Sequence, residues 1–325
     1  MKKLLFTFLL LAGVFALSAQ PAVSPQLRFG RIGLERGLSQ STVFVTYQDS
    51  QGYLWFGTED GLNKYNGYNF DVYKFDPTDS ASISNNIVRC IQEDKDGDLW
   101  IGTDNGLNRY NRHNGSFTRF LHDPSNARSL SNNLVSGIVQ DKAGILWIGT
   151  ANGLNALDPA TGNFTTYRST AGNPVTLSGN TISTLMADRS GTIWVGTSGS
   201  GLNAWDPVSK KAIRYLAAPG QLSENDVVAL AQDRQGVVWI GTVNGGLNSL
   251  SANGKFRSYT ADHNELPNNS VFSIHEDRQG VLWVGTLGGG LVAMNAARTS
   301  QRVYRHDVQN AESVSGNKVW SIFED

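Results

Sequence analysis

Cysteine is nearly absent from this 325-residue chain, and the single Cys90 excludes both an intramolecular disulfide and a metal site built from cysteines alone. Neither sign of charge is in excess, because 27 Lys and Arg face 28 Asp and Glu. With a net charge of −1, the chain has no strong field to recruit nucleic acid or an anionic membrane. Beyond one apolar run at the N-terminus, no stretch approaches the roughly 20 apolar residues that span a bilayer.

Signatures of catalysis and of metal binding are also scarce. The five histidines share no repeat position and no metal-ligand spacing. The sequence contains no nucleophile elbow, phosphate-binding loop or zinc-hydrolase motif. Residues 94–98 superficially resemble a calcium loop, but no glutamate stands at its twelfth position. We therefore expect no catalytic residue, no metal and no cofactor in this chain.

The first 19 residues have the composition of a secretory signal peptide. Two lysines precede an apolar run from Leu4 to Leu17, and small residues follow up to Ala19. An uncleaved anchor is the alternative, although the run is shorter than a membrane span. We predict cleavage after Ala19 and an exported chain in which residues 20–325 form the folded domain.

What the sequence does contain is a repeat with steps of 44 to 47 residues. Each copy has an Asp, a Gly three residues later, a Trp three residues after that Gly, and then a Gly-Leu pair. A fixed period in the forties with several short strands per unit is the signature of a β-propeller. The six tryptophans are Trp55, Trp100, Trp147, Trp194, Trp239 and Trp283.

Each repeat predicts four strands, and so the fold class is an all-β propeller of four-stranded blades. The innermost strand is apolar on both faces, as expected where neighbouring blades converge. It ends at an Asp-x-x-Gly turn, in which Asp accepts backbone N–H groups and Gly takes a positive φ. The second strand carries the Trp, which we interpret as structural, packed between blades with one partner for its indole N–H.

Six blades are complete, and a seventh only begins. Residues 317–325 provide the inner strand of a seventh unit as far as its turn residue, Asp325. Residues 27–32 read as a short strand without a Trp unit. Because propellers usually close by pairing strands from the two termini, we expect residues 27–32 to be the outer strand of blade seven. The two middle strands of that blade would be missing, the propeller is truncated in blade seven, and the ring should close poorly.

One column of the inner strand varies within an otherwise strict repeat, which indicates that it lines the channel rather than the core. Four of its members provide stacking surfaces and a charged donor, a combination suited to a sugar or a small carboxylate. The connections between the second and third strands also vary and add candidates at the channel mouth. The candidate ligand-binding residues are Phe44, Arg89, Phe272 and Trp320 in the column and Glu59, Asp104, Asn152 and Asn244 at the mouth. A variable lining without a ligand is the alternative for each.

An Asn ends the connection before each inner strand. We predict that its side chain bonds its own loop rather than a ligand. These residues are Asn86, Asn133, Asn180, Asn225, Asn269 and Asn317.

The pattern V-x-x-I-x-x-D-x-x-G-x-L-W-I-G-T-x-x-G-L-N-x-Y resembles the two-component regulator propeller repeat. The opening FGRIGLERGLSQSTVFVTYQDSQGYLWFGTEDGLNKYNG is similar to the usual first repeat of that family, and the resemblance covers residues 27–325. It implies the periplasmic sensor region of a hybrid histidine kinase receptor that responds to carbohydrate fragments and is not itself catalytic. The implied partners are a small-molecule or oligosaccharide ligand, and a C-terminal propeller, membrane and kinase regions of the same receptor, which would be a homodimer. The resemblance therefore implies that this chain is an N-terminal fragment.

Two alternatives stay open on the sequence. The first is a secreted propeller that acts as a protein-interaction platform. The second is an enzyme similar to streptogramin lyase, another propeller whose repeats pair Asp-x-x-Gly with a following Trp. That chemistry needs an acid or base histidine near a magnesium site at the channel mouth, and only His275 is suitably placed.

Overall fold

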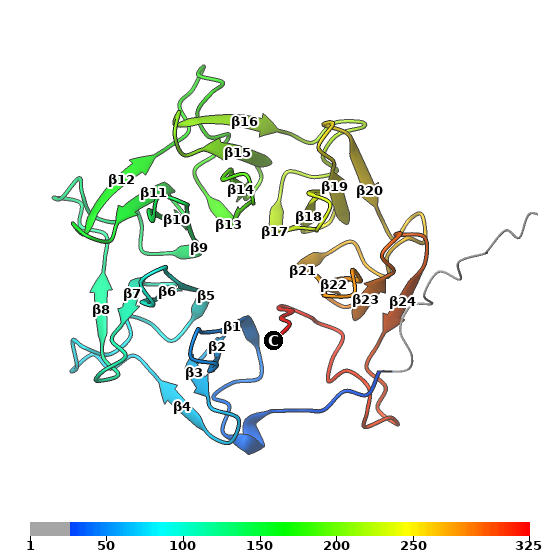
Figure 1. Cartoon of the computed structure of the whole chain (residues 1–325), viewed down its shortest axis with the longest axis horizontal. Helices are drawn as coiled ribbons and strands as arrows, with labels where there is room; N and C mark the ends of the chain where they lie inside the picture. The colour runs from blue at the N-terminus through cyan, green and yellow to red at the C-terminus, as the bar shows by residue number, and fades with distance from the viewer. Residues whose placement is uncertain (1–26) are drawn as a thin grey trace, which may run out of the picture.

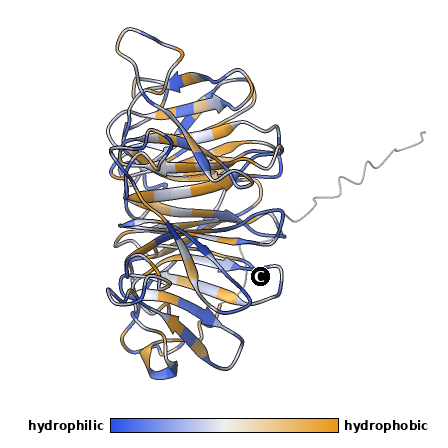
Figure 2. Cartoon of the chain, turned by 90° about the vertical axis from the view of Figure 1, so that its left-hand side faces the viewer, coloured by the Kyte–Doolittle hydropathy of each residue, from blue (hydrophilic) through white to orange (hydrophobic). Residues whose placement is uncertain are grey.

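The computed structural model describes residues 27–325, so the predicted signal peptide, residues 1–19, lies outside the described part of the chain. Over these residues the chain forms 24 strands in six four-stranded antiparallel sheets and one short 3-10 helix, Leu34–Arg36. The sheets are arranged in a ring like the blades of a propeller (Figure 1). Seen edge-on, the ring is a flattened disc (Figure 2). The predicted all-β propeller of four-stranded blades is confirmed.

Within each blade the four strands lie side by side in sequence order, with the first strand at the centre of the ring and the fourth at its rim. The inner strands are β1 (Val43–Gln48), β5 (Val88–Glu93), β9 (Val135–Gln140), β13 (Ile182–Ala187), β17 (Val227–Gln232) and β21 (Val271–Glu276). The second strands are β2 (Leu54–Thr58), β6 (Leu99–Thr103), β10 (Leu146–Thr150), β14 (Ile193–Thr197), β18 (Val238–Thr242) and β22 (Leu282–Thr286). The third strands are β3 (Gly61–Tyr65), β7 (Gly106–Tyr110), β11 (Gly153–Asp158), β15 (Leu202–Asp206), β19 (Leu247–Leu250) and β23 (Leu291–Met294). The outer strands are β4 (Phe70–Tyr73), β8 (Phe117–Phe120), β12 (Asn163–Tyr167), β16 (Lys211–Tyr215), β20 (Phe256–Tyr259) and β24 (Gln301–Tyr304).

The turn after each inner strand is closed by the side chain of its Asp. In blade 2, Asp94 Oδ1 accepts the backbone N–H groups of Asp96 and Asp98 at 3.0 and 2.9 Å, and Gly97 has the predicted positive φ of 86°. Asp94 Oδ2 accepts the indole N–H of Trp100 at 2.8 Å. All six blades have this Asp–Trp bond at 2.8 to 2.9 Å. The sequence predicted one partner for the indole but did not identify it.

The repeated tryptophans are core residues, as predicted. Five are buried, from 0% exposure at Trp55 to 7% at Trp194. Trp283 in blade 6 is only partly buried. It belongs to the blade whose following neighbour is incomplete, and so one side of its packing is lost.

The Asn before each inner strand bonds its own loop, as predicted. Asn133 Oδ1 accepts the N–H of His122 at 2.7 Å, and its carbonyl accepts the N–H of Gly106 at 2.6 Å. The side chains of all six asparagines accept the equivalent bond; Asn317 Oδ1 accepts the N–H of His306 at 2.8 Å. These amides are therefore committed to the loops.

The outer part of a seventh blade position is occupied by the N-terminal segment. Phe29 donates its N–H to the carbonyl of Glu312 at 2.9 Å, the same bond that Phe117 of β8 donates to the preceding loop at 2.7 Å. Its ring lies 5.6 Å from that of Tyr304, edge to face, as the ring of Phe117 lies 5.6 Å from that of Tyr73. The segment thus takes the place of an outer strand.

The inner part of this position is occupied by residues 317–325, which end beside β1 and β21 near the centre of the ring (Figure 1). Ser321 Oγ accepts the N–H of Thr46 at 3.2 Å. Neither this segment nor residues 27–32 forms a regular strand, unlike our expectation, because no second or third strand pairs with them within residues 27–325. A cavity of about 700 Å³ lies between these two segments.

Candidate functional site

The variable column lies at a β-bulge in every inner strand. In blade 2, Val88 pairs with Thr103 and Cys90 pairs with Gly102, which leaves Arg89 as the extra residue between them. A bulge residue stands outside the ladder, and its side chain is re-aimed. The six bulge residues are Phe44, Arg89, Ser136, Ser183, Val228 and Phe272. The sequence showed that this column is not core through its variation, but it did not show the bulge.

The close approach of neighbouring blades explains the glycine opposite each bulge. A Cβ added to Gly102 would meet Cys90 Sγ and would lie 2.5 Å from Val135 Cγ1 of the next inner strand. Both contacts are too short for any side chain, so only glycine fits where the inner strands converge. The Gly of each Trp-x-Gly-Thr motif is therefore required by packing at the centre of the ring.

Four of the predicted site residues form one continuous group. The ring of Trp320 lies 5.4 Å from that of Phe44 and 5.2 Å from that of Phe272, edge to face in both cases. The guanidinium carbon of Arg89 lies 4.6 Å from the centre of the Phe44 ring. We call Phe44, Arg89, Phe272 and Trp320 the aromatic cluster; it runs from blade 6 across the seventh position to blade 2.

An ion pair fixes the charged end of this cluster. Arg89 donates from Nε and Nη2 to the two carboxylate oxygens of Asp104 at 2.7 and 3.0 Å. The hydrogen bond with Asp104 raises the pKa of Arg89 above its usual value. Both side chains are partly exposed, so the pair contributes modestly to stability. Its main effect is to hold the guanidinium over Phe44, with two of its five donors used.

The other predicted mouth residues are tied to neighbouring loops. Glu59 accepts a hydrogen bond from Gln40 at 3.1 Å, Asn152 accepts one from Arg168 at 3.3 Å, and Asn244 donates its N–H to Glu224 at 2.6 Å. Asp104 is the mouth residue that contacts the aromatic cluster, through Arg89. The structure thus brings five of the eight candidates together.

His275, on which the lyase alternative depends, faces a single carboxylate. Its Nε2 lies 3.3 Å from Glu324 Oε2. Among residues 27–325, no group of three or more His, Cys, Asp or Glu side chains is arranged to hold a metal ion.

The same residues include no helix of the length and apolarity that a membrane span requires.

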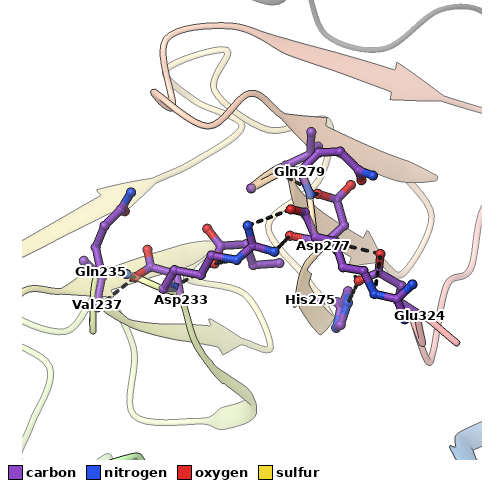
Figure 3. Close-up of polar contacts among 12 residues, drawn as sticks. Asp233, Gln235, Val237, His275, Asp277, Gln279 and Glu324 are labelled. Atoms are coloured by element: carbon purple, nitrogen blue, oxygen red, sulfur yellow. Dashed lines mark hydrogen bonds and ion pairs between the residues drawn. The ribbon is translucent and has the colours of Figure 1, made fainter.

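Backbone hydrogen bonds link successive blades at their Asp turns. In five of six cases, the residue after the turn Asp donates its backbone N–H to the side chain that precedes the next turn Asp, as Arg234 does to Glu276 at 2.7 Å. The exception lies between blades 3 and 4, where Ala187 precedes the turn residue Asp188. Figure 3 shows this linkage continuing from blade 5 to Glu324, which accepts from Arg278 at 3.1 Å. The other cases are Ser50 to Glu93, Lys95 to Gln140 and Arg189 to Gln232. Sequence reasoning missed this link, although a Gln or Glu precedes the turn Asp in six of seven units.

We expect Glu324→Ala to release residues 320–325 from blade 6 without unfolding the ring, because it removes the bonds from Arg278 and His275. Asn317 and Val319 keep their backbone bonds to Gly288 and Thr286. Hydrogen exchange followed by mass spectrometry should show faster exchange in residues 320–325 only.

Partial burial raises the pKa of Glu324, but the bonds from Arg278 and His275 outweigh it and hold the pKa below its usual range. The anchoring is therefore present above the usual glutamate pKa and is lost as pH falls through the lowered value.

The matched control is Gln140→Ala, which removes the same kind of link between blades 2 and 3, where complete blades pack on both sides. Hydrogen exchange in the Gln140→Ala variant should differ little from that in the parent chain. Equal exchange of residues 320–325 in Glu324→Ala and in the parent chain would contradict the anchoring role.

Six segments of the chain match the family model described as the two-component regulator propeller. The matched residues are 37–60, 82–105, 129–152, 176–199, 221–244 and 265–288. Each match contains one turn Asp and the Trp that it binds.

Two solved structures with this fold are extracellular domains assigned to hybrid two-component systems of B. thetaiotaomicron. The first is 30% identical with a TM-score of 0.79, and it covers 92% of this chain and 39% of its own length. The second is 28% identical with a TM-score of 0.72, and the match covers 92% of this chain and 38% of the second structure's chain. The chain is also 56% identical to Histidine kinase P4 of Formosa agariphila over 48 residues. These 48 residues make up 15% of this chain and 4% of the kinase. This chain spans about two fifths of the solved structures' length and a small part of the kinase.

Proposed function

This chain is built from two-component regulator propeller repeats, and we propose that it is the ligand-binding propeller of a hybrid two-component receptor. Its support is the 30% identity, over 92% of the chain, to an extracellular domain assigned to such a system. In this proposal the propeller lies in the periplasm, is not catalytic itself, and acts through membrane and kinase regions of a homodimeric receptor. The predicted signal peptide is consistent with that location.

The aromatic cluster is the ligand site of this proposal, and a carbohydrate fragment is its ligand. The observation that carries it is the bulge, which takes Phe44, Arg89 and Phe272 out of their ladders and places the first and last of them against Trp320. Apolar surfaces with a few placed polar groups are typical of small-molecule sites. Ring faces suit the C–H surfaces of a sugar, and the Arg89–Asp104 pair offers donors and acceptors for its hydroxyl groups.

We expect Trp320→Ala to weaken oligosaccharide binding at least tenfold, about 1.4 kcal/mol, because Trp320 is the ring that contacts both phenylalanines. Thermal shift against a panel of oligosaccharides identifies the ligand, since binding to the native state raises the melting temperature. Calorimetry then compares the variant with the parent chain.

Val228→Ala is the matched control, because Val228 occupies the same bulge position in blade 5 but is not a member of the aromatic cluster. It should bind normally. The proposal fails if no oligosaccharide shifts the melting temperature of the parent chain, or if the two variants lose affinity equally while circular dichroism shows both folded.

A further inference from the structure

Arg112, from the loop after β7, fills the seam where blades 1 and 2 meet. Its guanidinium donates to three acceptors, one in blade 1 and two in blade 2. Nη1 binds Asp49 Oδ2 at 2.7 Å, Nη2 binds Glu93 Oε1 at 2.8 Å, and Nε donates to the Gly97 carbonyl at 2.8 Å. These acceptors are a turn Asp, the residue before the next turn Asp, and the Gly of that next turn.

Arg298 fills the seam between blades 5 and 6 with the same kinds of partner. It pairs with the turn residue Asp233 at 3.9 Å and with Glu276 at 2.9 Å, and it donates to the Gly280 carbonyl at 2.8 Å. Its guanidinium carbon also lies 5.5 Å from the ring of Trp239, the tryptophan that is bonded to Asp233. Two seams of the ring are thus built to hold a guanidinium group.

Blade 4 (β13–β16) and blade 5 (β17–β20) are neighbours in the ring (Figure 1), and a small residue stands in their seam in place of an arginine. Ala252 follows Leu250 by two residues, as Arg112 follows Tyr110. Leu250 and Tyr110 are equivalent, because each pairs with the first residue of its outer strand. Both replacements shorten the side chain, and a cavity of about 230 Å³ lies beside them.

We call this cavity the blade 4/5 pocket. Its volume is below that of sites for drug-sized ligands and suits a group of side-chain size. No Lys, Arg or His among residues 27–325 lines it. The lining includes Asp188, Trp194, Tyr215, Gln232, Gly236 and Ala252.

Asp188 gives the blade 4/5 pocket a negative charge. Its Oδ1 accepts four hydrogen bonds within its own turn, whereas its Oδ2 accepts the indole N–H of Trp194 at 2.8 Å. The equivalent oxygen of Asp49 accepts both an indole N–H and Arg112. Burial raises the pKa of Asp188, but the bonds from Ser190 and Trp194 outweigh it and hold the pKa below its usual range. The carboxylate is therefore charged at neutral pH, with room for a second donor at Oδ2.

The pocket also retains the glycine carbonyl, but it lacks the second carboxylate. The Gly236 carbonyl lies 3.5 Å from the amide nitrogen of Gln232, at the limit of a hydrogen bond. Gln232 stands where Glu93 stands, so an amide nitrogen replaces the oxygen that binds Arg112. Trp194 adds an aromatic surface and, at 7% exposure, is the most exposed of the five buried repeat tryptophans.

We propose that the blade 4/5 pocket binds a guanidinium group on an aliphatic stem, the chemistry of an arginine side chain. The guanidinium takes the place that Arg112 holds in its own seam, donating to Asp188 Oδ2 and to the Gly236 carbonyl. Its plane lies against the ring of Trp194. A planar fork of donors reaches acceptors in two directions, which the point charge of an ammonium group does less well. This site is separate from the aromatic cluster and does not depend on the proposed receptor ligand.

Methylguanidinium tests the proposal directly, with methylurea as its neutral counterpart of similar shape. NMR of the indole N–H groups follows binding at fixed ionic strength, because the Trp194 indole donates to the oxygen that the ligand approaches. The Trp194 signal is assigned by its loss in Trp194→Phe. We expect this signal to move, with methylguanidinium binding at least tenfold more tightly than methylurea. The Trp239 signal is the internal control and should stay in place, since Arg298 already fills that seam.

Ala252→Arg supplies the arginine from within the chain, so it should abolish methylguanidinium binding and raise the melting temperature. The control is Val308→Arg, which adds the same charge at a loop residue that is 87% exposed and should leave binding intact.

Gln232→Glu restores the third acceptor and should strengthen methylguanidinium binding at least fivefold, with little effect on methylurea. This variant also decides the question if Ala252→Arg does not fold, because no gain in affinity would then count against the site.

Three results would overturn the proposal. They are a Trp194 signal that stays in place up to tens of millimolar methylguanidinium, equal affinities for methylguanidinium and methylurea, and unchanged binding in a folded Ala252→Arg variant. Free arginine and acetylarginine amide then identify the source of the group. Tighter binding of the blocked compound assigns the pocket to an arginine within a peptide chain, and tighter binding of free arginine assigns it to the amino acid.

Discussion

Trp147→Ala should lower the free energy of unfolding by about 4 kcal/mol, within the range of large-to-small changes at fully buried aromatic residues. Trp147 has 0% exposure, and its ring lies 6.0 Å from that of Trp205 and 5.7 Å from that of Tyr167, so its removal opens a cavity between blades 3 and 4. The change also removes the 2.8 Å hydrogen bond that the Trp147 indole N–H donates to the turn residue Asp141. Urea denaturation followed by circular dichroism measures the loss.

Trp283→Ala is the matched variant that separates the two causes. It breaks the same kind of bond, to Asp277 at 2.8 Å, but the ring is only partly buried beside the incomplete seventh position. We expect a loss about 2 kcal/mol smaller than at Trp147, because less apolar surface returns to water. Equal losses would show that the Asp–Trp bond, rather than packing, is the larger contribution.

The repeat made the fold predictable, because each local signal occurs six times. The Asp-x-x-Gly turn, the buried Trp and the loop-bonding Asn133 each follow from residues a few positions apart. Such short-range patterns are set by backbone geometry and by turn chemistry, both of which can be read along the chain. The aromatic cluster was partly predictable for the opposite reason, since its column departs from the repeat.

Contacts between blades could not be predicted in the same way. The bulge at Arg89 depends on how two strands register. Residues 317–325 have the sequence of an inner strand, yet a strand also needs a partner to complete its ladder. These features depend on residues of different units, and no periodicity encodes them.

Arg112 is a further contact of this kind and joins blades 1 and 2. Its Nη1 lies 2.7 Å from Asp49 Oδ2, its Nη2 lies 2.8 Å from Glu93 Oε1, and its Nε donates to the carbonyl of Gly97 at 2.8 Å. The side chain of Asp49 is fully buried, and those of Glu93 and Arg112 are 8% and 18% exposed. Arg298 makes a similar link between blades 5 and 6 from a different loop position, so the repeat alignment does not reveal either arginine.

Arg112→Ala should lower the free energy of unfolding by about 3 to 5 kcal/mol at neutral pH, because it leaves two carboxylates buried without their cation. Arg109→Ala is the control: its pair with Asp98, at 3.6 Å, is exposed on both sides and should contribute less than about 1 kcal/mol. Urea denaturation at pH 7 compares the two variants. A loss of similar size in both would show that Arg112 acts as an ordinary surface charge.

The pH dependence of this loss identifies its cause. Burial raises the pKa of Asp49, but hydrogen bonds from Arg112 and Trp55 outweigh it, so the pKa lies below its usual range. In the parent chain the stabilisation from Asp49 is therefore present above the usual aspartate pKa of about 3.9 and is lost as pH falls through the lowered value. In Arg112→Ala the pKa of Asp49 rises, and protonation below about pH 4 relieves the unpaired charge. The difference in unfolding free energy between the two chains should thus shrink as pH falls from 7 to below 4. A difference independent of pH would mean that Arg112 stabilises the contact between blades 1 and 2 by packing alone.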